Sequence, residues 1–384
     1  MGTKSKEIIK SIVKATESHG VTIGICPKCG NRSLLVSDTA VHCLHCEYTS
    51  SHEGVLLLTK GIYPTGIKFH TSPPAEKNML LNLYMDAEMC FRKALIKNSQ
   101  ALEYAHERGL SDDIISLFGI GYGEPLYGKM VKKYPKEILD SCGMFYQDNN
   151  GRYKDRFYNR LIIPIRDIHG AVIGFGGRIL EDKKHSPKYI NSPESLVFDK
   201  GCNLFAMNIA KNYAASYGLI LCEGYMDAIA LHKSGFPNAV ASLGTALTQQ
   251  QAALMRLHTQ TVYISYDMDD AGKKAAVRAI EILKDAGFND IRIINTKPYK
   301  DPDEIIQKEG MEGYRSRIKT SIPSWRYMLN IITDLMRRKQ ISVPEGYAQI
   351  GEEISGFSSD MVMKICAFYH LDPTYLNYKR ILSC

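Results

Sequence analysis

The chain has 384 residues, and 45% of them are apolar, which is ordinary for a folded protein with room for two or three domains. No run of about 18 apolar residues occurs, so we expect no membrane span. The net charge of +7 permits an anionic partner without identifying one.

The first segment, residues 1–62, contains two tight pairs of cysteines. Its start, residues 1–17, is basic with a helical period and predicts a short amphipathic helix instead of a signal peptide. Four thiolates in the pattern C-x2-C, thirteen residues, C-x2-C converge tetrahedrally on Zn²⁺, so we expect one structural zinc ion in a small β-rich ribbon. The other six cysteines are scattered, which indicates a reducing compartment and hence the cytoplasm. The expected zinc ligands are Cys26, Cys29, Cys43 and Cys46.

Residues 63–78 predict a linker, because adjacent prolines and small polar residues sustain neither a helix nor a sheet. We expect a mixed α+β subdomain over residues 79–212, starting with a helical pattern near Met79 and including a helix that begins after Ser111. The stretch 159–180 predicts two strands joined by a hairpin at "DIHG".

The string "GYGEPLYGKM" approaches the spacing of a phosphate-binding loop. Met130 stands where Ser or Thr is needed to bind Mg²⁺, and no clear strand precedes the string. We therefore interpret it as an ordinary loop and expect no helicase-type ATP hydrolysis.

Residues 213–320 repeat a unit of apolar strand, short polar turn and amphipathic helix. This pattern predicts a doubly wound α/β domain with a mainly parallel sheet. Residues 321–384 have a helical pattern and predict a C-terminal helical subdomain. The expected fold class is α/β, with a zinc ribbon before the mixed α+β basic subdomain.

Acids follow three strands of the expected parallel sheet. Ligands in such sheets bind beyond the carboxyl ends of the strands, so these acids are expected to meet at one edge. Helix capping accounts for at most one carboxylate of a cluster, and the others repel each other unless a cation lies between them. Oxygen ligands without His or Cys favour Mg²⁺ or Mn²⁺, which act typically on phosphates. The acids are Glu223, Asp267, Asp269, Asp301 and Asp303.

The strings "EGYMDAIAL", "ASLGTALT", "YDMDDAGKKAA" and "DPDEII" resemble the successive motifs of the TOPRIM domain of bacterial DnaG-type DNA primases. The upstream segments "DRFYNRLIIPIRDIHGAVIGFGGR" and "SPKYINSPESLVFDKGCNLF" resemble the basic part of the primase polymerase domain. The resemblance extends from about residue 20 to about residue 320. Topoisomerases and some nucleases share the Glu and Asp-x-Asp elements alone.

The resemblance assigns residues 213–320 to a TOPRIM domain. It implies that Glu223, Asp267 and Asp269 bind the catalytic Mg²⁺ or Mn²⁺, with Asp227, Asp301 and Asp303 as supporting acids. Basic and polar residues of the upstream segments are implied to hold nucleotide and template. These are Arg108, Arg156, Arg160, Arg178, Lys188, Tyr189, Asn191 and Lys200.

Two residues depart from the family pattern. Met268 lies between the two aspartates, where the family usually has glycine, so we expect that turn to avoid positive φ. Cys29 stands where the family more often has histidine, whereas many phage primases use four cysteines. A compact primase without a fused helicase would fit a phage or mobile element, and the helical end is short, so we expect a compact phage-type member, located in the host cytoplasm if a phage encodes it.

The implied function is the synthesis of short RNA primers from ribonucleoside triphosphates on a single-stranded DNA template, by metal-assisted nucleotidyl transfer. Strand cleavage, as in TOPRIM nucleases and topoisomerases, is one alternative, although no Tyr has the setting of a topoisomerase nucleophile. A non-catalytic zinc-ribbon adaptor for single-stranded DNA is the other, and it leaves the acids unexplained. The helical end is short for a helicase-binding domain, so contacts with a replicative helicase or replisome proteins are expected to be transient or to use another surface.

Overall fold

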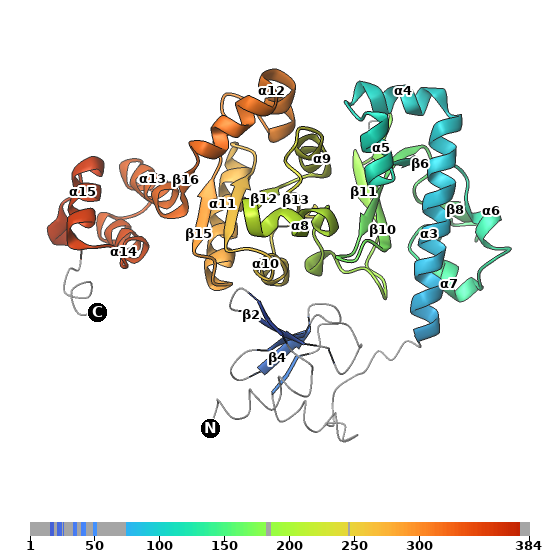
Figure 1. The fold of residues 1–384 in the computed structure, drawn as a ribbon, viewed down its shortest axis with the longest axis horizontal. Coiled ribbons are helices and arrows are strands. Elements are labelled where there is room, and N and C mark those ends of the chain that lie inside the picture. Colours follow the sequence, from blue (N-terminus) through green and yellow to red (C-terminus); the bar gives the residue numbers. More distant parts are fainter. Residues whose placement is uncertain are drawn as a thin grey trace.

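The computed structural model shows three groups of elements side by side and a fourth below them (Figure 1). The structure describes residues 74–181, 186–244 and 246–376, together with six short pieces of the N-terminal segment. Those pieces are residues 16–18, 21–24, 26, 34–36, 40–43 and 49–51.

The N-terminal pieces form a five-stranded antiparallel sheet in sequence order. Thr16 pairs with Ile23, so the backbone at the end of the expected N-terminal helix bonds in a strand instead. Residues 1–15 of that expected helix lie outside the described part. The strands are β1 (Thr16–Ser18), β2 (Val21–Gly24), β3 (Leu34–Val36), β4 (Ala40–Cys43) and β5 (Thr49–Ser51).

A helical layer opens the mixed α+β subdomain. Helix α3 (Pro74–Lys97) begins inside the segment expected as linker, because proline is well suited to a first helical turn, where its missing N–H costs no helical bond. Ser111 stands at the N-cap of α5 as expected, although its side chain makes no capping hydrogen bond. The remaining helices are α4 (Ser99–Glu107), α5 (Asp112–Phe118), α6 (Tyr127–Met130) and α7 (Lys136–Ser141).

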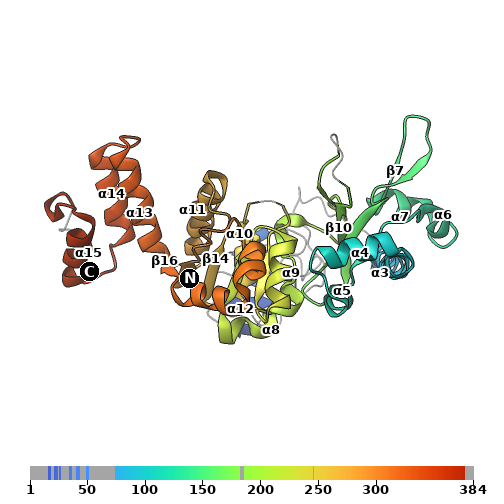
Figure 2. The same ribbon diagram turned by 90° about the horizontal axis from the view of Figure 1, so that it is seen from above.

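The sheet of this subdomain has the order β11-β10-β9-β6 and is antiparallel. The hairpin expected at "DIHG" is confirmed, with Gly170 at a φ of 95° in the turn. A separate hairpin, β7 with β8, projects from the subdomain (Figure 2). The strands are β6 (Gly121–Tyr122), β7 (Phe145–Gln147), β8 (Tyr153–Asp155), β9 (Arg160–Arg166), β10 (Val172–Ile179) and β11 (Tyr189–Asn191).

The central sheet confirms the expected parallel α/β pattern. Its order is β13-β12-β14-β15-β16, and only the short edge strand β16 runs antiparallel. The strands are β12 (Leu219–Cys222), β13 (Ala239–Ala241), β14 (Thr261–Ser265), β15 (Asp290–Ile293) and β16 (Ile322–Pro323). The helices are α8 (Met207–Tyr217), α9 (Tyr225–Lys233), α10 (Gln249–Arg256), α11 (Asp270–Asp285) and α12 (Pro302–Lys319).

Alternating residues of the central strands enter two different hydrophobic cores. Leu219 and Leu221 pack with α8, α10 and α11 on one face. Ile220 and Cys222 face the other way and join a core that continues into α3, β9 and β10 of the mixed subdomain. A stacked pair, Phe118 with Phe205, lies within this shared core, with ring centroids 5.5 Å apart. The two sheets are therefore joined by continuous apolar packing.

The C-terminal group is helical, as expected, with a core of its own around Leu329 and Ile350. It contains α13 (Ser324–Arg337), α14 (Val343–Glu353) and α15 (Ser359–Tyr369). Within the described ranges, no helix is long and apolar enough to cross a lipid bilayer. The domain boundaries given above remain predictions.

Candidate functional site

The acids of the central sheet follow the carboxyl ends of adjacent parallel strands. Glu223 directly follows β12, and Asp267 lies two residues beyond the end of the neighbouring strand β14. Asp301 ends the loop after β15 and caps α12, where its side chain accepts a hydrogen bond from Glu304 N at 2.9 Å. The parallel order of the strands thus places all three turns at one edge of the sheet.

Backbone contacts hold the first two turns together. Glu223 Oε1 accepts a hydrogen bond from Asp267 N at 3.1 Å, and Asp269 Oδ1 accepts one from Gly272 N at 2.7 Å. A Cβ on Gly272 would lie 2.0 Å from the carbonyl oxygen of Asp267 and 3.1 Å from Glu223 Oε1. The close approach of α11 to the turn therefore requires glycine at this position.

The closeness of the acids to one another affects their pKa values. Burial, followed by the charges of Asp267 and Asp269, raises the pKa of Glu223. Burial and the charges of Asp301 and Asp269 raise the pKa of Asp267, although Lys300 opposes the shift from 4.0 Å away. Several carboxylates thus share a part-buried site with little compensating positive charge.

Asp227, in the first turn of α9, has the largest shift of these acids. Burial raises its pKa to about 8, and the charges of Asp301, Asp267 and Asp303 contribute. Burial also raises the pKa of Asp303, and Asp301 adds to the shift. The supporting acids implied by the family resemblance therefore interact electrostatically with the acids at the strand ends.

The donor set suits a hard divalent cation. Among the described residues, no three His, Cys, Asp or Glu side chains already surround a common point as a metal cage. Glu223 and Asp269 each use one carboxylate oxygen for a backbone N–H and leave the other oxygen for a cation. A divalent cation would offset the repulsion that raises the pKa values of Glu223 and Asp267, so the chemistry of these acids fits Mg²⁺ or Mn²⁺.

Met268 lies between the two aspartates and is not one of the described residues that have a positive φ. The expectation that this turn lies in an ordinary backbone region is confirmed. Its side chain lines a cavity on the side of β15 and α13, which is described below.

Two of the expected nucleotide-binding arginines are buried and already bonded. Arg160 is 8% exposed and donates from Nη1 to the carbonyl oxygens of Gly177 and Pro187. Arg178 is 5% exposed and lies between Tyr104 and Tyr189, donating to both hydroxyls. These contacts give both arginines a role in holding the antiparallel sheet.

Two lysines differ from these arginines. Lys188 is exposed and Lys200 is half-buried, and in the described part of the chain neither ammonium group has a hydrogen-bond or ion-pair partner. Arg108 is exposed at the end of α4, and Arg156 uses its Nε for the carbonyl oxygen of Gly143 at 2.8 Å. Phosphate binding is therefore open to both lysines.

Asn191 connects the two sheets. Its Nδ2 donates to the carbonyl oxygen of Leu243 at 2.9 Å, and its Oδ1 accepts a hydrogen bond from the hydroxyl of Tyr225 in α9. Tyr189 and Tyr225 have ring centroids 6.4 Å apart. The expected nucleotide-binding residues Tyr189 and Asn191 thus lie directly against the helix that follows Glu223.

Sequence reasoning missed Tyr225, Lys300 and Gly272. Lys300 directly precedes the Asp-Pro-Asp string, and that position is a signal for a cation beside the acids. Tyr225 has only its place inside "EGYMD" as a signal, and Gly272 only its place inside "DDAGKKAA".

The zinc prediction is only partly covered. Cys26 and Cys43 are buried, whereas Cys29 and Cys46 lie outside the described residues. Strands β2 and β4 both run antiparallel to β3, and Leu34 pairs with Gly24 and with Cys43. Cys26 and Cys43 therefore lie at the same end of the sheet, as expected if both bind one zinc ion.

Two protein families match the chain. Residues 90–211 match the N-terminal domain of the DNA primase catalytic core, and residues 220–306 match the Toprim-like family. The DNA primase of Clostridium acetobutylicum is 37% identical over 306 residues, which cover 77% of this chain and 51% of that protein. The DNA primase of Aquifex aeolicus is 42% identical over 272 residues, covering 65% and 54% respectively. The chain thus spans about half the length of these curated relatives.

Solved structures agree with this result. The zinc-binding and RNA polymerase domains of the Aquifex aeolicus primase match with a TM-score of 0.65 and 31% identity, covering 98% of this chain and 96% of that one. A DnaG primase catalytic domain bound to single-stranded DNA has a TM-score of 0.66 and 31% identity, covering 79% and 98%. The Escherichia coli primase catalytic core has a TM-score of 0.64 and 31% identity, covering 78% and 97%. The chain therefore belongs to the family of DnaG-type bacterial DNA primases.

Proposed function

We propose that this chain synthesises short RNA primers from ribonucleoside triphosphates on a single-stranded DNA template. The observation that carries the proposal is the acid cluster at the edge of a Toprim-like sheet, where burial and the neighbouring acids raise the pKa values of Glu223 and Asp227. A similar catalytic domain has been solved with single-stranded DNA, which supports a DNA template for this chain. A cytoplasmic location is part of the proposal.

The acids have separate tasks in this proposal. Glu223, Asp267 and Asp269 hold divalent ions through their carboxylate oxygens, of which Glu223 and Asp269 each use one for a backbone N–H. Bound Mg²⁺ or Mn²⁺ would stabilise the charge that develops on the phosphates during nucleotidyl transfer. Asp227, Asp301 and Asp303 support these acids from behind and set the total negative charge of the site.

The basic residues also divide into two kinds. Lys188 and Lys200 bind the triphosphate and the template backbone through their compact positive charge. Arg108 and Arg156 assist them and can each hold a phosphate through two hydrogen bonds. Arg160 and Arg178 act indirectly, because their hydrogen bonds hold β9, β10 and β11 and so position Tyr189. Tyr189 and Asn191 contact the nucleotide from β11.

The N-terminal ribbon binds the template in this proposal. Cys26, Cys29, Cys43 and Cys46 would hold one Zn²⁺, which would stabilise this sheet of short strands. Contacts with a replicative helicase or other replisome proteins are proposed as transient.

The test replaces Asp269 by asparagine and by alanine in the full chain. Asparagine keeps the N-cap bond to Gly272 N while removing the charge, whereas alanine removes both. We expect both variants to lose primer synthesis by at least about 100-fold, the scale of a lost electrostatic contribution to catalysis. Asp269→Asn should keep the zinc content and the stability of the parent protein. Undiminished primer synthesis by Asp269→Asn would refute the proposed role of this acid.

The same reaction mixture distinguishes the alternatives. With single-stranded DNA, labelled ribonucleoside triphosphates and Mg²⁺, a primase makes labelled oligoribonucleotides. A Toprim nuclease would shorten the DNA without consuming triphosphate. A non-catalytic adaptor would bind the DNA equally well after Asp269→Asn and leave both substrates unchanged.

A further inference from the structure

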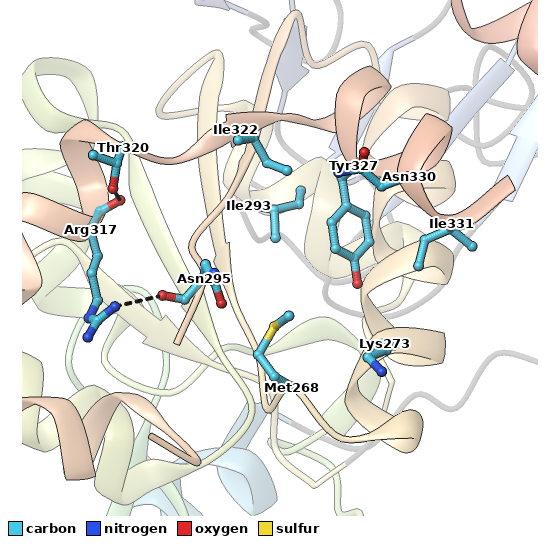
Figure 3. A pocket seen from close by; sticks show the side chains of 10 residues that line it. All are labelled: Met268, Lys273, Ile293, Asn295, Arg317, Thr320, Ile322, Tyr327, Asn330 and Ile331. Atoms are coloured by element: carbon cyan, nitrogen blue, oxygen red, sulfur yellow. Dashed lines mark hydrogen bonds between the residues drawn. The ribbon is translucent and has the colours of Figure 1, made fainter. Parts of the chain in front are cut away.

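A cavity lies beside the acidic turn. It has a volume of about 480 Å³, within the range of roughly 300–1,000 Å³ usual for small-molecule pockets. Its walls come from α11, β15, the end of α12, β16 and α13 (Figure 3). Met268 forms one wall, so the cavity adjoins the turn that carries Asp267 and Asp269.

The lining combines apolar walls with hydrogen-bond donors. Ile293, Ile322 and Ile331 supply aliphatic surface, and the Tyr327 ring supplies an aromatic one. Two asparagines use their side-chain oxygens inside the protein: Asn295 Oδ1 accepts from Lys297 N, and Asn330 Oδ1 accepts from the Tyr369 hydroxyl. Their amide nitrogens remain available as donors.

The charge of the lining is positive. Lys273 and Arg317 line the cavity, whereas no carboxylate does. Arg317 pairs with Glu309 at 2.8 Å through Nη2 and bonds two backbone carbonyls through Nη1, whereas its buried Nε has no hydrogen-bond partner among the described residues. Lys273 has only a distant bond of 3.3 Å to Asp270, whose side chain is 95% exposed, so its ammonium group is available to a ligand.

Tyr327 is the most informative residue of the lining. It is 6% exposed, and its hydroxyl has no hydrogen-bond partner in the part of the chain that the structure describes. In Figure 3 this hydroxyl points toward the space between Met268 and Lys273. The ring is buried while the hydroxyl points into the cavity, so the hydroxyl is placed to bond a ligand atom.

We propose that this cavity binds a small planar aromatic molecule that carries hydrogen-bond acceptors and one anionic group. The aromatic part of the ligand lies between Tyr327 and the isoleucines. Its acceptors receive hydrogen bonds from the amide nitrogens of the two asparagines and from the Tyr327 hydroxyl, and its anionic group pairs with Lys273. Nucleoside monophosphates and non-nucleotide aromatic acids share this chemistry. The cavity lining shares no residue with the acids and lysines proposed above to act in primer synthesis.

The test measures binding, without template, triphosphate or divalent ion, and is therefore independent of primer synthesis. The methionine methyl groups of the full chain are isotope-labelled and followed by NMR, and Met268→Leu assigns the Met268 signal. Adenosine monophosphate and uridine monophosphate represent nucleotides, and anilinonaphthalene sulfonate represents other aromatic anions. We expect a saturable shift of the Met268 signal with at least one probe, and the responding probe identifies the source of the ligand.

Three variants locate the binding in the cavity. Ile331→Trp fills the cavity and should abolish the shift, and Tyr327→Phe should weaken binding roughly fivefold, the loss of one neutral hydrogen bond. Lys273→Glu keeps an acid-tolerant first helical turn and should weaken an anionic probe at least about tenfold. Lys132→Glu makes the same charge change at an exposed lysine outside the cavity lining, and as the matched control it should leave the Met268 shift unchanged. The proposal is overturned if no probe shifts Met268, or if the shift survives both Ile331→Trp and Lys273→Glu.

Discussion

The acids at the edge of the central sheet and the basic residues of the mixed subdomain are positioned by different parts of the structure. Parallel strands deliver Glu223, Asp267 and Asp301 to one edge, and N-caps and backbone bonds then fix the turns. The basic residues come from helices, loops and antiparallel strands that do not converge on one edge. Some of them, such as Arg160 and Arg178, already form hydrogen bonds within the protein. The position of a charged side chain can be predicted from sequence when the strand order fixes it. It cannot be predicted when it depends on neighbouring side chains that are distant in sequence.

The sharpest way to break this comparison is Gly272→Ala, because its Cβ would lie 2.0 Å from the carbonyl oxygen of Asp267. The turn must move to accept the methyl group, so we expect a stability loss of about 3 kcal/mol and loss of primer synthesis. Gly351→Ala is the control, since its Cβ meets no atom within 4 Å in helix α14. Chemical denaturation measures both variants, and equal stabilities would show that the turn is not held as described.

A paired substitution compares the two kinds of basic residue. Arg178→Met leaves the hydroxyls of Tyr104 and Tyr189 without their buried donor and should cost about 2–3 kcal/mol of stability. Lys188→Met should change stability by less than about 0.5 kcal/mol and weaken binding of single-stranded DNA or triphosphate. Urea denaturation and fluorescence anisotropy measure the two effects. A reversed pattern would contradict the division between positioning and binding residues.

The pH dependence of stability tests the charge of the acidic edge. The pKa of Asp227 is about 8 in the fold and 3.8 ordinarily, so between these values the folded protein keeps a proton that the unfolded chain has lost. This carboxyl therefore destabilises the fold increasingly as pH rises toward about 8. Without added divalent ion, Asp227→Asn should gain about 2 kcal/mol near pH 8.5 and clearly less near pH 5.

The control for this titration is Asp285→Asn, which removes an exposed acid at the end of α11. This control makes the same substitution at a site outside the acidic edge and so shows the general effect of replacing an aspartate by asparagine. Millimolar Mg²⁺ should reduce the gain from Asp227→Asn, because a bound cation already offsets the repulsion. A gain that is equal at both pH values would contradict the raised pKa.

The smallest effect is expected at Lys300, which is 4.0 Å from Asp267 Oδ2 and 73% exposed in its side chain. Lys300→Met should change the free energy of unfolding by less than about 0.5 kcal/mol, as for other exposed ion pairs. Lys300→Arg keeps the charge and serves as the control. A loss of several kcal/mol in Lys300→Met alone would show that this lysine is a structural part of the acidic edge.

Much of the fold was predictable because its pattern is local. Strand, turn and helix repeat through residues 213–320, and this repetition indicates both the parallel sheet and the edge where the acids meet. Residues 159–180 indicated the hairpin through their apolar runs and the turn at Gly170. The start of α3 was missed because proline ends helices and also begins them.

The rest of the site depends on partners distant in sequence. Arg178 is buried because Tyr104 and Tyr189 happen to flank it, and neither neighbour is evident from the string "GFGGR". The cavity beside Met268 is built from five elements that meet only in the folded chain. Motifs therefore identified which residue types matter, while tertiary packing decided which of them are available.

The apolar core that passes from α3 and β10 into one face of the central sheet has a mechanical consequence. Domains joined by small polar contacts hinge readily, whereas a wide apolar junction resists hinging because bending would expose it to water. Lys188 belongs to the mixed subdomain and Glu223 follows a strand of the central sheet. Because a shared apolar core joins these two parts, we expect the distance between the two residues to stay constant through a reaction cycle. Progress along a template would then come from the nucleic acid sliding through a rigid frame.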